Sequence, residues 1–292
     1  MPVVVTGASG DIGAVLVPML VVRGEVRALI RDAAAADPLR ATGAKVAVAD
    51  LADTATASTA MEGAHTVIHL AGGLDLPDER AYQAANLGTV LDALEAASEA
   101  EVTRFLLLSY PGASADSPNA YLRAKGLAEE AVRGSGFEHL ILRSTHVYGP
   151  RQPWLDGMRA AASRAVAATV VGTGRQRIAP TYVEDVARTL VSGDDRAGAV
   201  EGTFGLQGPD EVTADELVDL LAGRRRRKVH LAPGAARKAA RLLGQRLSLT
   251  MLEVLAMDSL ADDLPSAEDE LGVSLTPLRE GLAASGVPVG VA

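Results

Sequence analysis

The chain has 292 residues, 48% hydrophobic and 22% charged, a composition that suits one large α/β domain with an appended lobe. Its formal net charge of −9 argues against nucleic acid and anionic membranes as main partners, and the absence of cysteine excludes disulfides and thiolate chemistry. Because the first residues already form a core strand and no apolar run is long enough to span a bilayer, we expect a cytoplasmic protein without a signal peptide.

The first predicted elements are a buried parallel strand at residues 3–5 and a helix over residues 11–22. Glycines at three-residue spacing join them, and such a turn lets a phosphate approach the backbone N–H groups at the helix N-terminus. The alternative is an ordinary turn that happens to contain glycine. The predicted ligand contacts are Thr6, Gly7, Ser9, Gly10, Asp11, Ile12 and Gly13.

The Gly-x-x-Gly-x-x-Gly spacing after Thr6 resembles the short-chain dehydrogenase/reductase superfamily, rather than the Gly-x-Gly-x-x-Gly pattern of other nicotinamide enzymes. The resemblance implies an α/β fold with a doubly wound parallel sheet, the Rossmann fold, that binds a nicotinamide dinucleotide.

The second predicted strand covers residues 25–30 and is followed by Arg31 and Asp32. In a dinucleotide-binding fold this position meets the adenosine ribose, where an arginine suits a 2′-phosphate and a carboxylate suits a 2′-hydroxyl. Arg31 comes first, so NADP(H) is the favoured cofactor. Asp32 keeps NAD(H) possible, and Arg31 as a merely solvated loop residue is the alternative.

Two further strands, at residues 44–49 and 66–70, run into segments that the superfamily uses for its cofactor. The residues concerned are Asp50 and Leu51 after the first strand, and Ala71 and Gly72 after the second. The resemblance implies that the aspartate contacts the adenine ring, although a helix N-cap is an equally good role for it. The small residues resemble the stretch that lies beneath the nicotinamide ribose.

A long helix is predicted over residues 79–100, and Asn86 within it resembles the asparagine of the superfamily's Asn-x-x-Gly-Thr segment. The resemblance implies support of the active site through a backbone contact, although a polar residue in a helix often faces solvent. His65 and His69 are four residues apart on a strand rather than a helix, so we expect no metal site there.

Residues 104–109 form the fifth predicted strand, and the helix that follows carries Tyr121 and Lys125 one turn apart on one face. A phenol, with a pKa of about 10, is a poor acid at neutral pH. A nearby ammonium and a bound nicotinamide cation favour the phenolate, so the tyrosine can exchange a proton with a substrate oxygen. This Tyr-x-x-x-Lys resembles the superfamily's catalytic pair, which implies that Lys125 also holds the nicotinamide ribose hydroxyls.

The superfamily's third catalytic group is a Ser or Thr at the end of the fifth strand, and Ser109 is the candidate. Many relatives carry a second serine here, whereas this chain continues with Tyr110 and Pro111. Ser109 could therefore be structural, leaving Ser114, Tyr110 or no side chain to polarise the substrate oxygen. Tyr110 is for that reason also a predicted substrate contact.

The segment at residues 144–150 follows the sixth predicted strand and resembles the Arg-Pro-x-x-Val-Tyr-Gly-Pro loop of the extended and atypical branches, without its proline. In those branches the loop folds beside the nicotinamide and leads into the substrate lobe. His146 is predicted to face cofactor or substrate, with packing inside the loop as the alternative. Trp154, on a helix predicted over residues 152–168, is predicted to line the substrate pocket.

Residues 180–187 resemble the Val-x-Asp-Val-Ala motif of the extended branch, in which Asp185 helps to fix the second lobe. A carboxylate favoured by the dipole at a helix N-terminus is compatible with the same position.

Residues 213–216 form a capping box that begins another helix. The basic run at residues 224–228 either binds an anionic substrate or forms a solvated helix end.

These motifs together resemble the extended or atypical, epimerase-like and NmrA-like branch of the superfamily. We expect residues 1–150 to bind the dinucleotide, residues 181–205 to return to that domain, and residues 151–180 and 206–292 to form a substrate-binding lobe. The implied function is NAD(P)H-dependent reduction of a carbonyl on a small organic substrate, with Tyr121 as proton donor. A nucleotide-sugar epimerase or dehydratase with tightly bound NAD, and a non-enzymatic NADP(H)-binding regulatory protein, are the alternatives. Relatives often dimerise, so the resemblance makes a homodimer one possible assembly.

Overall fold

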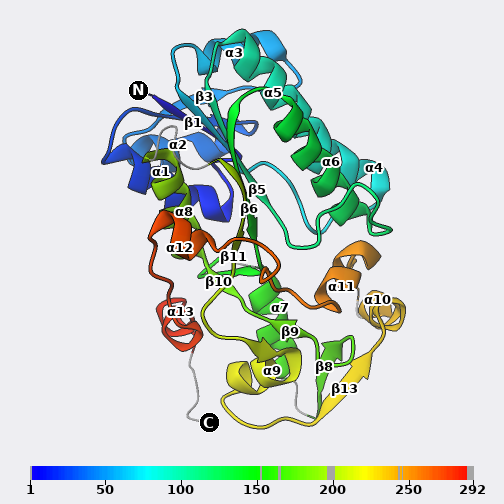
Figure 1. Ribbon diagram of the computed structural model, residues 1–292. Coiled ribbons are helices and arrows are strands. Elements are labelled where there is room, and N and C mark those ends of the chain that lie inside the picture. Colours follow the sequence, from blue (N-terminus) through cyan, green and yellow to red (C-terminus); the bar gives the residue numbers. More distant parts are fainter. Residues whose placement is uncertain are drawn as a thin grey trace.

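The computed structural model describes residues 2–151, 153–163, 166–195, 201–242, 244 and 246–287, without the side chains of residues 153, 154 and 161. Its centre is a parallel sheet of seven strands in the order β11-β6-β5-β4-β1-β2-β3 (Figure 1). The strands are β1 (Val3–Thr6), β2 (Val26–Ile30), β3 (Lys45–Val48), β4 (Thr66–His69), β5 (Arg104–Ser109), β6 (Glu138–Ser144) and β11 (Gly202–Leu206). The predicted doubly wound α/β sheet is confirmed.

Alternation of side chains along each strand divides the core into two layers. Val3 and Val5 of β1 face one layer and Val4 faces the other, because successive residues of a strand point to opposite sides. The first layer is covered by α1 (Asp11–Val21), α2 (Ala36–Ala41), α8 (Val183–Asp195) and α12 (Ala267–Leu271). The second is covered by α3 (Thr54–Met61), α5 (Thr89–Glu99) and α6 (Ala120–Gly134).

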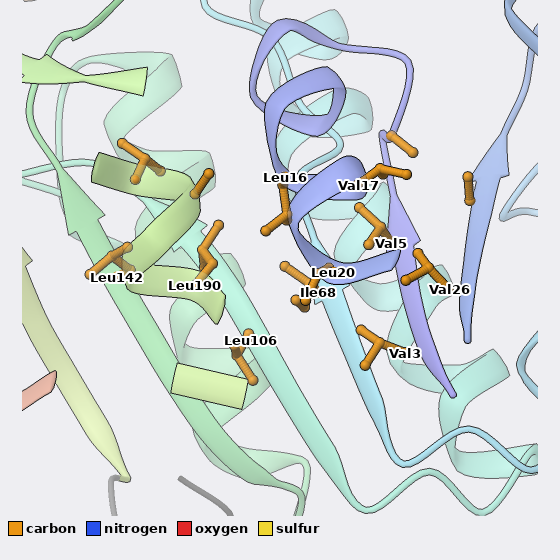
Figure 2. Packing of buried hydrophobic residues seen from close by; sticks show 14 of the residues in the cluster. Val3, Val5, Leu16, Val17, Leu20, Val26, Ile68, Leu106, Leu142 and Leu190 are labelled. Atoms are coloured by element: carbon orange, nitrogen blue, oxygen red, sulfur yellow. The ribbon is translucent and has the colours of Figure 1, made fainter. Parts of the chain in front are cut away.

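Leucine side chains from two helices fill the first layer (Figure 2). Leu16 and Leu20 of α1 lie over β1 and β4, and Leu190 of α8 lies over β5 and β6. The sheet is thus shielded on both faces, as an all-parallel sheet requires.

The order of strands reverses between β1 and β4, since the chain runs outward to β2 and β3 and then returns to the other side of β1. Ligands of open α/β sheets bind beyond the carboxyl ends of the strands at such a point. The turns after β1, β2 and β4 all lie there, which places the predicted cofactor residues at one edge of the sheet.

The helix predicted over residues 79–100 is not continuous. It consists of α4 (Glu79–Gln83), a π-helical segment η2 (Ala84–Gly88) and α5. The wider turn falls on Asn86, which is fully buried. π-Helical turns are rare and occur mostly where a helix is locally adapted to function, so this irregularity marks the region as a site.

A smaller lobe lies below the sheet in Figure 1. Its elements are α7 (Pro153–Ala162), β8 (Ala168–Val171), β9 (Arg177–Ile178), β12 (Val212–Thr213), α9 (Ala214–Ala222), β13 (Lys228–Leu231), α10 (Pro233–Leu242), α11 (Leu249–Leu255) and α13 (Leu278–Ala284). The short pair β7 (Val147–Tyr148) and β10 (Thr181–Tyr182) lies between the lobe and the sheet, and the 3-10 helix η1 (Ala33–Ala35) follows β2. The capping box at residues 213–216 is confirmed, because Thr213 and Glu216 each bond the other's backbone N–H.

Residues 206–292 are all predicted to belong to the lobe, but part of this segment returns to the sheet domain. Ala267 and Leu271 of α12 pack into the first core layer, and Ser266 pairs with Gly205 of β11. Asp185 accepts hydrogen bonds from the backbone N and the hydroxyl of Thr276, at 2.7 and 2.8 Å. This return is favoured because it removes the apolar surface of Ala267 and Leu271 from water. Among the described residues, no helix combines the length and apolarity needed to cross a membrane.

We predict that Gly126→Ala lowers the free energy of unfolding by at least about 2 kcal/mol, the usual cost of overpacking. A β-carbon on Gly126 of α6 would stand 2.1 Å from the carbonyl carbon of Ser114, so backbone would have to move. Gly134→Ala, on the same helix with no atom within 4 Å of the added carbon, should stabilise by about 0.5 kcal/mol. Urea denaturation of both variants measures the difference, and similar values for the two would contradict the packing described.

Candidate functional site

The turn after β1 is shaped by glycines at the two positions where a side chain would collide with backbone. Gly7 has φ +67°, and a β-carbon there would lie 2.6 Å from the N of Ala71. A β-carbon on Gly13 would lie 2.4 Å from the carbonyl oxygen of Ala8. The turn therefore touches the turn after β4, and the first turn of α1 packs directly on it.

The N-terminus of α1 fits a phosphate group. Gly10 is the N-cap residue, with extended backbone, and no side chain caps the helix. The N–H groups of a first helical turn have no partners within the helix, and the helix dipole adds positive potential there. Ser9 is exposed beside Gly10, and Asp11 and Ile12 are half-buried. The turn thus presents donors that only an anion or water would satisfy.

One carboxylate stands at this helix end. The Oδ1 atom of Asp11 lies 3.7 Å from Nε of Arg151, which follows the β7 segment. Partial burial raises the pKa of the Asp11 carboxyl, and the Arg151 guanidinium opposes that shift. This ion pair joins the phosphate-binding turn to the start of the lobe.

Arg31 and Asp32 follow β2 at the same edge of the sheet. The Oδ1 atom of Asp32 accepts a hydrogen bond of 2.9 Å from the N of Ala34 and so caps the helix η1. Arg31 is exposed, and its side chain makes no hydrogen bond or ion pair with any residue that the structure describes. The guanidinium is therefore available to a ligand, whereas the carboxylate already has a local role.

Asp50 and Leu51 have different environments. Asp50 is exposed, and its Oδ1 accepts a bond of 3.2 Å from the N of Ala52. Leu51 is buried in the second core layer beside Val4 and Leu29. Leu51 thus anchors the segment, and the aspartate stands at its surface.

A buried polar chain runs under the glycine turn. The hydroxyl of Thr6 lies 2.9 Å from Nδ1 of His69, and the hydroxyl of Thr89 lies 3.4 Å from its Nε2. Burial, with the Lys125 charge as a lesser cause, lowers the pKa of His69 to about 3. His69 is therefore a neutral, structural histidine, and the side chain of Thr6 is directed into the protein. Within the described residues, no cluster of His, Asp and Glu could hold a metal ion.

Gly72, Asn86 and Lys125 meet at the end of β4. Asn86 accepts a bond of 3.1 Å from the N of Gly73 and donates one of 3.0 Å to its carbonyl oxygen. A β-carbon on Gly72 would lie 2.8 Å from Oδ1 of Asn86 and 3.6 Å from Nζ of Lys125. Asn86, from the π-helical segment, thus holds the small-residue stretch in place beside the lysine ammonium. Ala71, next to it, is half-buried.

Tyr121 and Lys125 project from the first turns of α6, which Asn119 caps by accepting bonds from the N of Tyr121 and of Leu122. Lys125 donates a hydrogen bond of 2.9 Å to the carbonyl oxygen of Leu108. Burial lowers the pKa of Lys125 to about 8, with a smaller opposing effect of Glu129. Burial also raises the pKa of the Tyr121 phenol, with Tyr82 as a lesser cause.

Tyr121 forms an aromatic cluster with two other tyrosines. The ring of Tyr121 meets those of Tyr110 and Tyr82 edge-on, with centroid separations of 5.8 and 6.2 Å. The hydroxyl of Tyr82 donates to the carbonyl oxygen of Leu74 and lies 2.6 Å from that of Ser248. The hydroxyl of Tyr121 makes no such bond to the described part of the chain, so it is the phenol of the cluster that can serve a ligand.

Ser109 is directed away from this cluster. Its hydroxyl donates a hydrogen bond of 2.6 Å to Oε1 of the fully buried Glu129. The same carboxylate accepts two bonds of 2.8 Å from Arg143 and one of 2.5 Å from Arg133. The role of Ser109 here is to complete a buried ionic network. Glu129 is i+4 from Lys125 on the same helix face, a spacing that could have pointed to it.

Tyr110 occupies the place next to Tyr121 instead. Its hydroxyl donates a bond of 2.9 Å to Oγ of Ser259 and lies 3.0 Å from Nδ1 of His146. Burial lowers the pKa of His146 to about 4 and raises that of the Tyr110 phenol. Both groups are therefore neutral at pH 7 and serve as hydrogen-bonding rather than charged groups. Ser114 is exposed and takes no part in these contacts. Among the described residues, its hydroxyl accepts one hydrogen bond, from the N of Asp116.

His146 also lines a cavity of about 360 Å³ in the lobe. Residues of α7, α9, α10 and α11 make up most of its wall. The side chain of Trp154, predicted to line a pocket, lies outside the described residues, although its position falls within α7.

The fold and the glycine turn together define the class: an NAD(P)-binding protein of the doubly wound α/β type. The chain belongs to the NAD(P)H-binding family, whose profile matches residues 7–191. The expected membership of an NAD(P)H-binding family is confirmed, and relatives named as reductases are among the similar proteins.

Three relatives illustrate the range of the family. The chain is 32% identical over 130 residues to the mitochondrial NADH dehydrogenase (ubiquinone) 1 alpha subcomplex subunit 9 of Arabidopsis thaliana, covering 44% of this chain and 32% of that protein. It is 31% identical over 195 residues to the ceramide reductase of Caulobacter vibrioides, covering 65% and 60%. It is 28% identical over 266 residues to the 4-hydroxy-2-methyl-3-oxo-4-farnesyl-3,4-dihydroquinoline-1-oxide ketoreductase of Stigmatella aurantiaca, covering 83% and 79%. The aligned region is thus about a third of the first relative's length and three fifths of the second's.

Solved structures share the fold over almost the whole chain. The UDP-glucuronic acid 4-epimerase of Bacillus cereus, in complex with UDP-glucuronic acid and NAD, superposes with a TM-score of 0.73 at 18% identity, covering 98% of this chain and 99% of that one. The UDP-glucose 4-epimerase of Thermotoga maritima superposes with a TM-score of 0.75 at 19% identity, covering 98% and 97%.

We predict that Ser109→Ala lowers the free energy of unfolding by about 1–2 kcal/mol, because it removes a buried hydrogen bond to a carboxylate. Ser114→Ala, five residues along on the exposed loop, should change it by less than about 0.5 kcal/mol. Urea denaturation at neutral pH compares the two. Equal values would show that the bond to Glu129 does not stabilise the fold.

Proposed function

We propose that this protein is an NADPH-dependent reductase of a carbonyl group on a small organic substrate. The observation that carries the proposal is the placement of Tyr121 and Lys125 on one face of α6, with Lys125 against Gly72 at the carboxyl ends of the strands. A phenol with a free hydroxyl, next to a buried lysine, is the acid that reduction of a carbonyl needs.

Carbonyl reduction needs a bound dinucleotide and a proton donor, and the residues of the chain suit both. The glycine turn and Arg31 would hold the phosphates of the dinucleotide, and Lys125 would hold its nicotinamide ribose. When bound, the reduced nicotinamide supplies the hydride. Tyr121 gives the proton of its phenol to the substrate oxygen, and burial keeps that phenol protonated beforehand. Lys125 is charged below a pH of about 8, and its ammonium stabilises the phenolate that remains.

The choice of NADPH rests on the end of β2. Asp32 caps the helix η1 with its own carboxylate, while Arg31 is exposed with no partner among the described residues. A guanidinium binds a phosphate through parallel charged hydrogen bonds. These contacts favour a cofactor with a 2′-phosphate.

Two other functions have support of their own. The likeness in fold to the two epimerases favours a nucleotide-sugar epimerase, whose tightly held NAD would copurify with the protein. The likeness to a subunit of NADH dehydrogenase favours a non-enzymatic role in an assembly. The intact Tyr121 and Lys125 favour the reductase over the assembly subunit, because a purely structural role needs neither an acid nor an ammonium there.

We predict that NADPH binds more tightly than NADH and that Arg31→Ala weakens NADPH binding by about tenfold to a hundredfold, the loss of a charged hydrogen bond. NADH binding should be unchanged. Titration followed by nicotinamide fluorescence measures both, with Arg40→Ala as an exposed-arginine control. Equal affinities in the wild type, or NAD retained through purification, would reject this cofactor assignment and favour the epimerase.

We predict that Tyr121→Phe reduces the rate of carbonyl reduction by about a hundredfold to ten-thousandfold, the usual contribution of a general acid. NADPH affinity should stay the same. Tyr82→Phe is the matched control, since it deletes a phenol of the same cluster that bonds Leu74 and Ser248, and it should change the rate little. NADPH oxidation with a panel of ketones and aldehydes is the assay. A Tyr121→Phe variant as active as the wild type would refute the mechanism.

A further inference from the structure

The cavity in the lobe is lined almost entirely by apolar side chains. It lies among α7, α9, α10 and α11 and the strand pair β8–β13. The apolar side chains in its wall include Met158, Ile178, Leu231, Met251, Leu252 and Leu255. A pocket of this size and lining binds hydrocarbon, because its gain comes from removing apolar surface from water.

Charge in the cavity wall is unsuited to a nucleoside diphosphate. Asp75 is the charged residue of the described lining, which contains neither arginine nor lysine. The basic residues 224–227 lie outside this wall. Two phosphates placed in the cavity would lose their hydration without a cationic partner, at a large cost in free energy.

The cavity shares a residue with the site of the proposed acid. His146 lines the cavity and also lies 3.0 Å from the Tyr110 hydroxyl, and the Tyr110 ring meets that of Tyr121 edge-on. Val254 of α11 packs in the same cluster as Tyr110 and Tyr121, while Met251 and Leu255 of that helix line the cavity. The cavity is therefore connected to the Tyr121 cluster by two sets of contacts, one through His146 and Tyr110 and the other through α11.

A buried acceptor in the wall points to a ligand. Gln176 donates to the carbonyl oxygens of Val171 and Leu255, at 2.7 and 3.1 Å, which fixes the orientation of its amide. Its Oε1 is buried and has no hydrogen-bond partner in the part of the chain that the structure describes. Buried polar atoms in native proteins are almost always satisfied, so this position suits a donor. The donor would be a water molecule or a hydroxyl group that the substrate carries besides its carbonyl, because a ketone oxygen and a hydrocarbon chain have no hydrogen to donate.

We propose that the substrate is an apolar carbonyl compound with a long hydrocarbon chain, which fills the cavity while the carbonyl lies at Tyr121. This proposal rests on the reductase function proposed above. It assigns the lobe as a hydrocarbon-binding site and excludes nucleotide sugars as substrates. His146, the lining residue that lies 3.0 Å from the Tyr110 hydroxyl, then marks the end of the cavity nearest the reacting carbonyl.

Equilibrium binding tests this without turnover or nicotinamide. Straight-chain methyl ketones of increasing length displace the fluorescent probe 1-anilinonaphthalene-8-sulfonate from the full chain. We expect the dissociation constant to fall about fourfold with each added methylene until the cavity is full. UDP-glucose should not displace the probe. No dependence on chain length, or displacement by UDP-glucose at lower concentration than by any ketone, would overturn the proposal.

Two substitutions on one helix locate the site. Ala240 of α10 is buried and lines the cavity, whereas Ala235 of the same helix is exposed and does not. Ala240→Phe should weaken binding of the long ketones at least tenfold and leave the short ones unaffected, and Ala235→Phe should change neither. Met251→Ala enlarges the cavity, so the dissociation constant should stop falling only at a longer ketone than in the wild type. This variant keeps the test valid if Ala240→Phe does not fold. Equal behaviour of all three variants would overturn the assignment.

The binding result is distinguishable from a failure of the reductase function. If long chains bind and no carbonyl is reduced, the cavity assignment stands and the proposed reaction is wrong. If short ketones are reduced with no gain from added methylenes, the reaction stands and the hydrocarbon site is wrong.

Discussion

The turns after β1 and β4 approach so closely that one added carbon on Gly7 would stand 2.6 Å from the N of Ala71. This contact lies at the point where the strand order reverses, and it brings the N-terminus of α1 beside the small-residue stretch at Gly72. Asn86 holds that stretch through Gly73, and Lys125 lies against it. The phosphate-binding turn thus meets the small-residue stretch through backbone contact, and the side chain of Lys125 connects that stretch to the acid–base helix.

The sheet and the glycine turn could be predicted because their signals are local. Apolar runs of four to six residues bounded by glycine or polar residues indicate buried strands, and the helix starts carry capping residues such as Asn119 and Thr213. The spacing of Tyr121 and Lys125 likewise needs only the geometry of one helix. These features depend on neighbours within a few positions along the chain.

The rest of the site depends on contacts between distant segments. Ser109 bonds a carboxylate twenty residues away, and Tyr110 bonds Ser259, so no local pattern shows which of these two adjacent residues faces Tyr121. The π-helical turn at Asn86 keeps the residue pattern of an ordinary helix and differs only in its hydrogen bonds. The cavity is formed by helices that contribute two or three residues each, and short amphipathic helices give no sign of the shape of the space that they will enclose.

The last strand of the sheet in chain order, β11, pairs with β6, with Gly202 aligned to Leu140 and Leu206 to Ser144. Its first residue, Gly202, lies fifty-eight positions after Ser144, where β6 ends. During synthesis, the other six strands are complete well before β11 leaves the ribosome. Until then β6 presents an unpaired, apolar edge, the kind of surface on which chains aggregate. The emerging chain therefore depends on the timely arrival of residues 202–206, or on a chaperone that covers the edge first.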